Sequence, residues 1–136
     1  MLSKEAEKAK NKYKKLGALI SWLVVEPWKP KMWKVKLQRL NFDYAVAINP
    51  KSKGHKKEKL TLAGLETWKI TTPNSDPEKI LLYFHGGAYQ VGSPKGYYPM
   101  LTHLARETGF TIYIPDYRLA PEHYYPAQVE DGVAAY

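Results

Sequence analysis

The chain has 136 residues, of which 44% are hydrophobic and 13% aromatic, which is typical of a globular domain and excludes a disordered segment. It contains no cysteine, which excludes a disulfide framework, a thiolate zinc site and a cysteine nucleophile. The net charge of +8 is uneven, with +11 over residues 1–60 and −3 over residues 61–136. Either a solvated lysine face or a basic surface for a membrane or nucleic acid would produce this imbalance. We expect no nucleic-acid partner, because Arg39 is the only arginine in the basic part.

Residues 2–24 predict an amphipathic helix, because apolar residues recur there at alternating spacings of four and three. Such a helix can make a peripheral contact with a membrane or pack over a neighbouring domain, and the pattern leaves both alternatives open. No apolar run reaches the ~18 residues that a membrane-spanning helix needs. The run LGALISWLVV is not followed by the small residues of a signal-peptide cleavage site. We therefore expect a cytoplasmic protein.

The middle of the chain changes from a basic loop to strands. Residues 49–59 are polar and basic and predict an exposed loop. The sequence KLTLAGLETWKITTP has a period of two and predicts a hairpin of two short strands, joined near Ala63-Gly64. A turn at NSDPE precedes the apolar run KILLYF, which predicts a strand buried on both faces.

The last third repeats a strand-and-helix pattern. MLTHLARETG predicts a helix that stops at Gly109, FTIYIPDYR predicts a second buried strand, and AQVEDGVAAY predicts the opening turns of another helix. Strands that alternate with helices through short connections indicate an α/β fold in which crossover helices join parallel strands.

Two glycines follow a histidine directly after the strand KILLYF. His85, Gly86 and Gly87 would therefore lie at the carboxyl end of a strand, where α/β folds bind their ligands. Glycine lets a ligand approach the backbone N–H groups closely, and such donors stabilise the oxygen that becomes negative during acyl transfer. An oxyanion hole and an ordinary glycine turn both fit these residues. A phosphate-binding loop does not, because the GxxxxGK[ST] pattern is absent.

Two blocks of sequence, HGGAYQVGS and DYRLAPEHYYPAQVEDGVAAY, together resemble the hormone-sensitive-lipase-like esterases of the α/β-hydrolase superfamily. They span residues 85–136 in the order of that family and at about its usual spacing. The similarity is looser over residues 60–84 and is compositional over residues 1–59, where the family carries variable cap helices. The resemblance implies an enzyme that hydrolyses small-molecule carboxylic esters through a Ser-Asp-His triad, with no cofactor and no metal ion.

The resemblance also implies roles for individual residues. Gly86 and Gly87 would supply the donors of the oxyanion hole, while His85 and Ala88 would support the loop. Ala88 stands where many members of the family have a third glycine. A further group of residues would shape the loop beneath the site and would be structural: Asp116, Tyr117, Arg118, Pro121 and Glu122.

The nucleophile elbow of this fold, G-x-S-x-G, does not occur in the sequence. Ser93 in VGSPKG cannot replace it, because Gly92 stands one residue too late and Pro94 has no N–H to donate to the oxyanion. We therefore expect an α/β protein that forms the first half of an α/β-hydrolase fold, with a mixed, mostly parallel sheet and an N-terminal cap helix. The cap helices are expected over residues 1–48. The N-terminal part of the core, truncated before the nucleophile elbow, is expected over residues 49–136.

The leading functional hypothesis is a carboxylic ester hydrolase of which this chain carries the oxyanion-hole half and is inactive alone. One alternative is a non-catalytic relative that binds a small acid or ester, and another is a basic protein that binds surfaces through residues 1–59. A second copy of the chain or a complementing C-terminal fragment are the remaining expected partners. With the elbow strand absent, one edge of KILLYF would be exposed, and its other edge would pair with FTIYIPDY. No pair among His55, His103 and His123 has the spacing of metal ligands.

Overall fold

The structure of the protein is a computed structural model that describes residues 31–136. Helix α2 (Met32–Val46) crosses the boundary between two compact units, Met1–Gln38 and Arg39–Tyr136. The helix predicted over residues 2–24 lies outside the described residues, and the predicted domain boundary stays a prediction. The other elements all belong to the second unit: β1 (Lys56–Leu62), β2 (Leu65–Thr71), β3 (Asp76–Leu82), α3 (Pro94–Thr108), β4 (Phe110–Pro115) and α4 (Ala127–Ala135).

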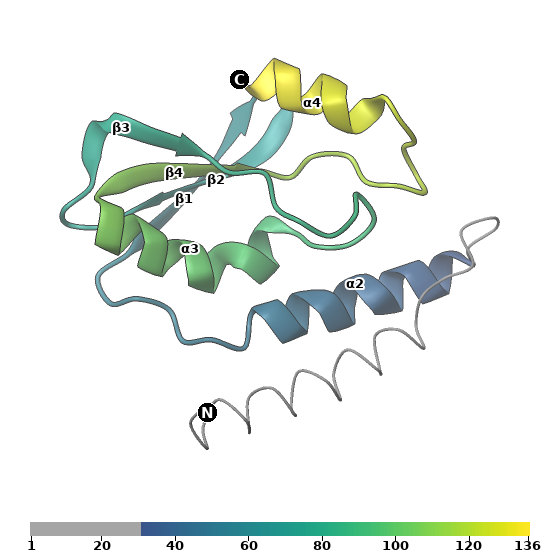
Figure 1. The fold of residues 1–136 in the computed structure, drawn as a ribbon, viewed down its shortest axis with the longest axis horizontal. Coiled ribbons are helices and arrows are strands. Elements are labelled where there is room, and N and C mark those ends of the chain that lie inside the picture. The colour runs from purple at the N-terminus through teal and green to yellow at the C-terminus, as the bar shows by residue number, and fades with distance from the viewer. Residues whose placement is uncertain (1–30) are drawn as a thin grey trace, which may run out of the picture. The chain divides into compact units, whose positions relative to one another are not determined.

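The four strands form one mixed sheet in the order β1-β2-β4-β3. The predicted parallel pairing of β3 with β4 is confirmed, and α3 is the crossover helix between them. In Figure 1, α3 lies below the strands and α4 above them. The sheet has fewer parallel pairs than expected, because β1–β2 and β2–β4 are antiparallel. The predicted hairpin accounts for the first of these, since a turn of two residues, Ala63 and Gly64, can join only antiparallel strands.

The hydrophobic core lies between the sheet and α3. Alternate residues of β2 and β4 point toward the helix, and a stripe of α3 residues meets them. The buried members of this core are Trp68, Ile70, Tyr98, Leu101, Ala105, Ile112 and Ile114. The predicted second buried strand is therefore confirmed as β4, and the segment MLTHLARETG is helical and packs against it.

The prediction that residues 49–59 form an exposed loop is wrong for the last part of this range. β1 begins at Lys56 and pairs along its whole length with β2. The hydrophobic pattern fails here because the lysines of this strand place their ammonium groups over an aromatic ring. Lys57 Nζ lies 4.1 Å and Lys59 Nζ 5.5 Å from the centre of the Trp68 ring. Lysines along an edge strand also oppose the addition of another strand, which favours this sequence at the edge of the sheet.

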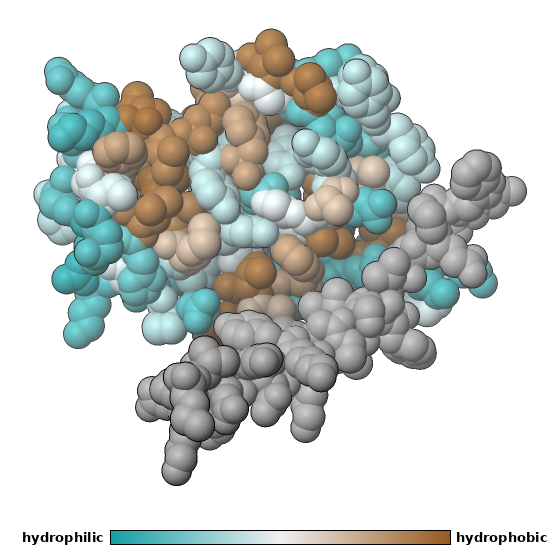
Figure 2. Space-filling model, in the orientation of Figure 1, coloured by the Kyte–Doolittle hydropathy of each residue, from teal (hydrophilic) through white to brown (hydrophobic). Residues whose placement is uncertain are grey.

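Strand β3 is the opposite edge of the sheet, so the prediction that KILLYF is buried on both faces is wrong. Ile80 is 58% exposed and Phe84 41% exposed. Asp76 also belongs to β3, although NSDPE was predicted to be a turn, and the pairing with β4 is irregular between Asp76 and Ile80. Figure 2 shows apolar side chains gathered over β3 and α4. The predicted exposed edge beside an apolar strand is thus present in the structure.

Helix α3 has a sequence signal at each end. Ser93 caps its N-terminus by accepting a hydrogen bond from Gly96 N at 3.2 Å, and Pro94 occupies the first helical position. Gly109 ends the helix with a left-handed φ of 70° and donates to Ala105 O at 2.9 Å, as the sequence predicted. These caps fix the point at which the chain leaves the loop after β3.

Replacing Ile112 by alanine is expected to lower the free energy of unfolding by about 2–5 kcal/mol, because its side chain is fully buried between β2 and α3. Urea unfolding followed by Trp fluorescence measures this change. Val133→Ala is the control, since Val133 is 73% exposed and should change stability by less than about 0.5 kcal/mol. Equal effects of the two substitutions would contradict this description of the core.

Candidate active site

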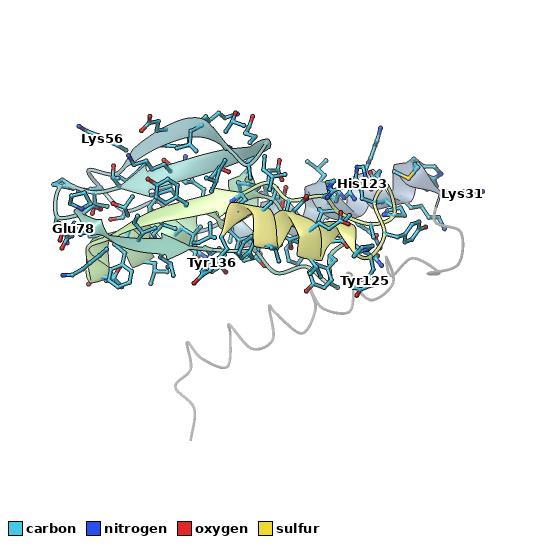
Figure 3. All side chains as sticks on the ribbon, turned by 90° about the horizontal axis from the view of Figure 1, so that it is seen from above. Lys31, Lys56, Glu78, His123, Tyr125 and Tyr136 are labelled. Carbon is cyan, nitrogen blue, oxygen red and sulfur yellow. The ribbon has the colours of Figure 1, made fainter. Side chains whose placement is uncertain are left out.

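A loop of eight residues, His85–Gly92, follows β3 and is called the glycine loop below. Tyr83 N donates to Tyr113 O at 2.8 Å, which extends the parallel ladder to the start of the loop. Because β3 and β4 run in the same direction, the loops that follow them meet at one edge of the sheet. Figure 3 shows that the segment with His123 and Tyr125, which follows β4, lies at the end of the unit opposite Glu78.

His85 is only 3% exposed and lies between two tyrosine rings. Its ring centre is 4.5 Å from that of Tyr117 and 5.7 Å from that of Tyr97, with both pairs stacked at 26°. Nδ1 lies 3.0 Å from Gly86 O, and the backbone carbonyl of His85 accepts a 2.6 Å hydrogen bond from the Tyr117 hydroxyl. This environment holds the ring in place and keeps it away from water.

Burial is the largest influence on the pKa of His85 and lowers it, while the contact with Gly86 O and the carboxylates of Asp116 and Asp43 act in the opposite direction. The imidazole is therefore neutral at neutral pH, and it suits a structural role better than proton transfer. Its Nε2 atom is buried without a hydrogen-bond partner among the described residues.

The backbone of the glycine loop adopts left-handed conformations at three successive residues, with φ of 133° at Gly87, 54° at Ala88 and 58° at Tyr89. A Cβ atom added to Gly87 would lie 1.9 Å from Val91 O, so no other residue fits there without moving the turn. The Gly87 carbonyl accepts hydrogen bonds from the N–H groups of Gln90 and Val91, both at 3.0 Å. These bonds close the turn.

The N–H groups of Gly87 and Ala88 have no hydrogen-bond acceptor within residues 31–136. The backbone of Gly86 lies near the Tyr97 hydroxyl, whose pKa is raised mainly by burial and lowered to a smaller extent by Gly86. A Cβ atom on Gly86 would lie 3.2 Å from the same hydroxyl. The loop thus offers two successive backbone donors and a third that faces a side chain.

The glycine loop borders a cavity of about 400 Å³. Its wall combines the backbone of the loop with aromatic and small apolar residues from the segment just after β3, the segment after β4, and α4. The lining residues are Phe84, His85, Gly86, Gly87, Ala88, Tyr89, Tyr117, Gln128, Val129 and Gly132. All four residues that the sequence singled out for the site, from His85 to Ala88, therefore lie together on this cavity.

The segment after β4 supports the site through hydrogen bonds. Arg118 donates from its backbone N–H and from Nε to the carboxylate of Asp131, at 2.8–3.0 Å, and so ties the segment to α4. These contacts lower the pKa of Asp131, although burial alone would raise it. Asp116 N donates to Glu66 O at 2.8 Å, which joins the same segment to β2. The contacts of Asp116 and Arg118 agree with the structural role that the resemblance implied.

Two residues contribute more than the sequence predicted. Tyr117 was expected to shape a loop, but its ring lines the cavity, stacks on His85 and holds the carbonyl of that residue. Burial raises its pKa to about 12, so its hydroxyl stays protonated and donates. Arg39 was noted only as a lone arginine among lysines, yet it donates to the carbonyl of Gln90 in the glycine loop at 2.8 Å. The sequence feature that could have pointed to this contact is that Arg39 is a single arginine among many lysines.

The other polar candidates lie apart from the cavity. Ser93 Oγ donates to Asp43 Oδ2 at 2.6 Å and caps α3, so it is a helix cap and not a nucleophile. His103 Nε2 lies 2.8 Å from Pro50 O, and His55 Nδ1 contacts Ser52 O. No serine hydroxyl is hydrogen-bonded to a histidine ring in the described part of the chain.

Neither a metal site nor a membrane span is evident in the residues that the structure describes. No group of three or more histidine, cysteine, aspartate or glutamate side chains among residues 31–136 could hold a metal ion. None of the helices in that range is long and apolar enough to cross a membrane.

Comparison with known proteins identifies relatives of the second unit. Residues 81–136 match the family described as the alpha/beta hydrolase fold. The chain is 41% identical over 64 residues to an acetyl-hydrolase of Streptomyces hygroscopicus, covering 47% of this chain and 21% of that protein. It is 38% identical over 68 residues to the esterase LipI of Mycobacterium tuberculosis, covering 50% of this chain and 21% of that protein. The chain thus spans only about a fifth of the length of these relatives.

Solved structures agree with this likeness. An esterase from the bacterial hormone-sensitive lipase family superposes with a TM-score of 0.73 at 32% sequence identity, covering 90% of this chain and 40% of that one. The similarity includes the mixed sheet and extends beyond the two sequence blocks around the cavity. The chain therefore has part of the α/β-hydrolase fold and resembles an N-terminal portion of the hormone-sensitive-lipase-like esterases.

Proposed function

We propose that this chain carries the oxyanion-binding half of a carboxylic ester hydrolase that works through a serine acyl-enzyme. The observation that carries the proposal is the pair of unpartnered N–H groups at Gly87 and Ala88, in a loop that borders a cavity. The named activities of the relatives, esterase and acetyl-hydrolase, support the same reaction class.

The chemistry follows from where charge develops. Attack of a serine oxygen on an ester carbonyl converts that carbonyl into a tetrahedral oxyanion, which two or three fixed N–H donors stabilise by roughly 3–4 kcal/mol each. The sequence predicted Gly86 and Gly87 as the donors. Because Ala88 N also has no acceptor within residues 31–136, we propose the segment from Gly86 to Ala88 as the donor set, with Gly87 at its centre.

The described residues offer no group that could form the acyl-enzyme. The glycine-flanked elbow is absent from the sequence, and Ser93 is engaged with Asp43 and the start of α3. His85 is neutral, buried and stacked between tyrosines, so it braces the glycine loop and does not serve as the general base. We therefore propose that the 136-residue chain has no esterase activity alone.

The proposed substrate is a small-molecule ester with a short to medium acyl chain, and no cofactor takes part. The cavity beside the glycine loop, at about 400 Å³, has an apolar wall that includes Phe84, Tyr117 and Val129. A second candidate is a non-catalytic protein that binds a small acid or ester. The observation in its favour is that the N–H donors and the cavity can bind an anion without a nucleophile.

The purified chain is expected to hydrolyse p-nitrophenyl butyrate no faster than buffer, because a bound ester would meet donors but no nucleophile. Release of p-nitrophenolate, measured by its absorbance, tests this. Gly87→Asp is the matched variant, since its Cβ would lie 1.9 Å from Val91 O and displace the donors, and its carboxylate adds a negative charge to the loop. Hydrolysis that this substitution abolishes would mean that a residue of this chain does form the acyl-enzyme.

Butylphosphonate, a tetrahedral anion, is expected to shift the amide resonances of Gly87 and Ala88 saturably in ¹⁵N NMR spectra. Gly87→Ala should weaken this binding at least about tenfold, because the new Cβ collides with Val91 O and displaces the donors. Gly64→Ala is the control: Gly64 also has a positive φ, 84°, but open space around it. Unshifted wild-type amides at saturating phosphonate would contradict the oxyanion-binding role.

Acidification from about pH 7.5 to about pH 5.5 is expected to lower the free energy of unfolding, with His85 as a contributor. The folded state lowers the pKa of His85, so in this range the unfolded chain binds a proton that the folded chain does not. His85→Gln should therefore show a smaller pH dependence of unfolding, measured by urea titration at each pH. The exposed residue His103 provides the control His103→Gln. An unchanged pH dependence in His85→Gln would refute the neutral, bracing role.

A further inference from the structure

The second half of α2 lies against the C-terminal end of the glycine loop and the start of α3. Arg39 and Asp43 are four residues apart and therefore share one face of the helix. Arg39 Nε donates to Gln90 O at 2.8 Å, and Asp43 Oδ2 accepts from Ser93 Oγ at 2.6 Å. Gly96, in the first turn of α3, comes so close to α2 that a Cβ atom there would lie 2.7 Å from Asp43 Oδ1. This face of α2 thus contacts the chain just before and just after Gly92.

The guanidinium of Arg39 also reaches the segment that follows β4. It donates from Nη1 and Nη2 to the two carboxylate oxygens of Glu122, each at 2.7 Å, and from Nη2 to Ala120 O at 2.9 Å. The hydrogen bonds from Arg39 are the largest influence on the pKa of Glu122 and lower it. One side chain therefore joins three segments: α2, the glycine loop and the loop before α4.

What the ion pair between Arg39 and Glu122 contributes to the structure depends on its geometry. A solvent-exposed ion pair by itself contributes little to stability, and the two side chains here are 24% and 36% exposed. The pair differs from most surface pairs because it is bidentate and because the same guanidinium also binds two backbone carbonyls. We therefore expect the contacts of Arg39 to affect the position of the loops more than the overall stability of the protein.

The glycine loop needs such outside contacts, because two of its left-handed residues, Ala88 and Tyr89, are not glycine. Backbone conformations of this kind persist only where the surrounding structure holds them. Two successive carbonyls of the loop are held from outside: Tyr89 O accepts from Ala120 N at 2.8 Å, and Gln90 O accepts from Arg39 Nε. Without the second contact, the turn between Gly87 and Gln90 could relax.

We propose that Arg39 is a positioning residue, which holds the glycine loop against the Glu122 segment and so fixes the direction of the Gly87 and Ala88 N–H groups. The effect on ester hydrolysis rests on the proposed function, whereas the effect on the loop does not. Lysine cannot replace Arg39, because one ammonium group cannot bind a carboxylate in a bidentate manner and two separate carbonyls as well.

The experiment compares Arg39→Lys with the wild-type chain by amide hydrogen exchange and phosphonate titration. The exchange reporters are the amides of Gln90 and Val91, which are bonded to Gly87 O, and the amide of Ile112 reports on the core. Lys59→Ala is the control, because it breaks an exposed ion pair of 2.8 Å with Glu66 and lies on β1, the edge strand opposite β3. We expect exchange of the two loop amides to rise at least about tenfold in Arg39→Lys, with that of Ile112 unchanged.

Butylphosphonate binding is expected to weaken by a similar factor in Arg39→Lys and to stay unchanged in Lys59→Ala. If the wild-type chain does not bind the phosphonate, the proposed function fails, but the exchange of the loop amides still tests the role of Arg39. If Arg39→Lys exchanges and binds like the wild type, Arg39 does not position the loop. Faster exchange at Ile112 to the same extent would also overturn the inference, because it would show a general loss of stability.

Discussion

The parallel pairing of β3 with β4 is the contact on which the candidate site depends. Two parallel strands end at the same edge of the sheet, so the glycine loop after β3 and the segment after β4 lie next to each other. The Tyr117 hydroxyl can then reach the carbonyl of His85, at 2.6 Å, across 32 positions of sequence. The buried residues of β2, β4 and α3 hold this pairing in place, so the geometry of the site depends on the packing of the core.

Around the site, the protein keeps ionisable groups neutral or paired. His85 is buried between tyrosine rings and stays neutral, and burial keeps the hydroxyl of Tyr117 protonated. The charged residues lie at the periphery, where Arg118 binds Asp131 and Arg39 binds Glu122. A cavity wall without unpaired charge leaves the backbone N–H groups of the glycine loop as its main polar feature, and these groups favour an oxygen that carries partial or full negative charge.

The two edges of the sheet differ in character. β1 carries lysines whose ammonium groups lie over the Trp68 ring, and lysines at an edge oppose pairing with another strand. β3 instead exposes Ile80, which lines an apolar groove together with Phe84 and Ala135, the last residue of α4. The solved esterase that resembles this protein is matched over 40% of its length.

The sequence by itself determined the local features of this protein. The Ala63-Gly64 turn, the stop of α3 at Gly109 and the need for glycine at Gly87 follow from neighbours within a few residues, and the resemblance of residues 85–136 identified the superfamily. Only the tertiary structure decided that the lysine-rich start of β1 belongs to the other edge strand of the sheet, because a basic segment of this kind fits an exposed loop and an edge strand equally well. It also decided the roles of Tyr117 and Arg39. Their hydrogen bonds join residues that are from 32 to 83 positions apart in the sequence. A local sequence pattern cannot predict such bonds, because it does not indicate which distant carbonyl or carboxylate will lie beside a side chain in the fold.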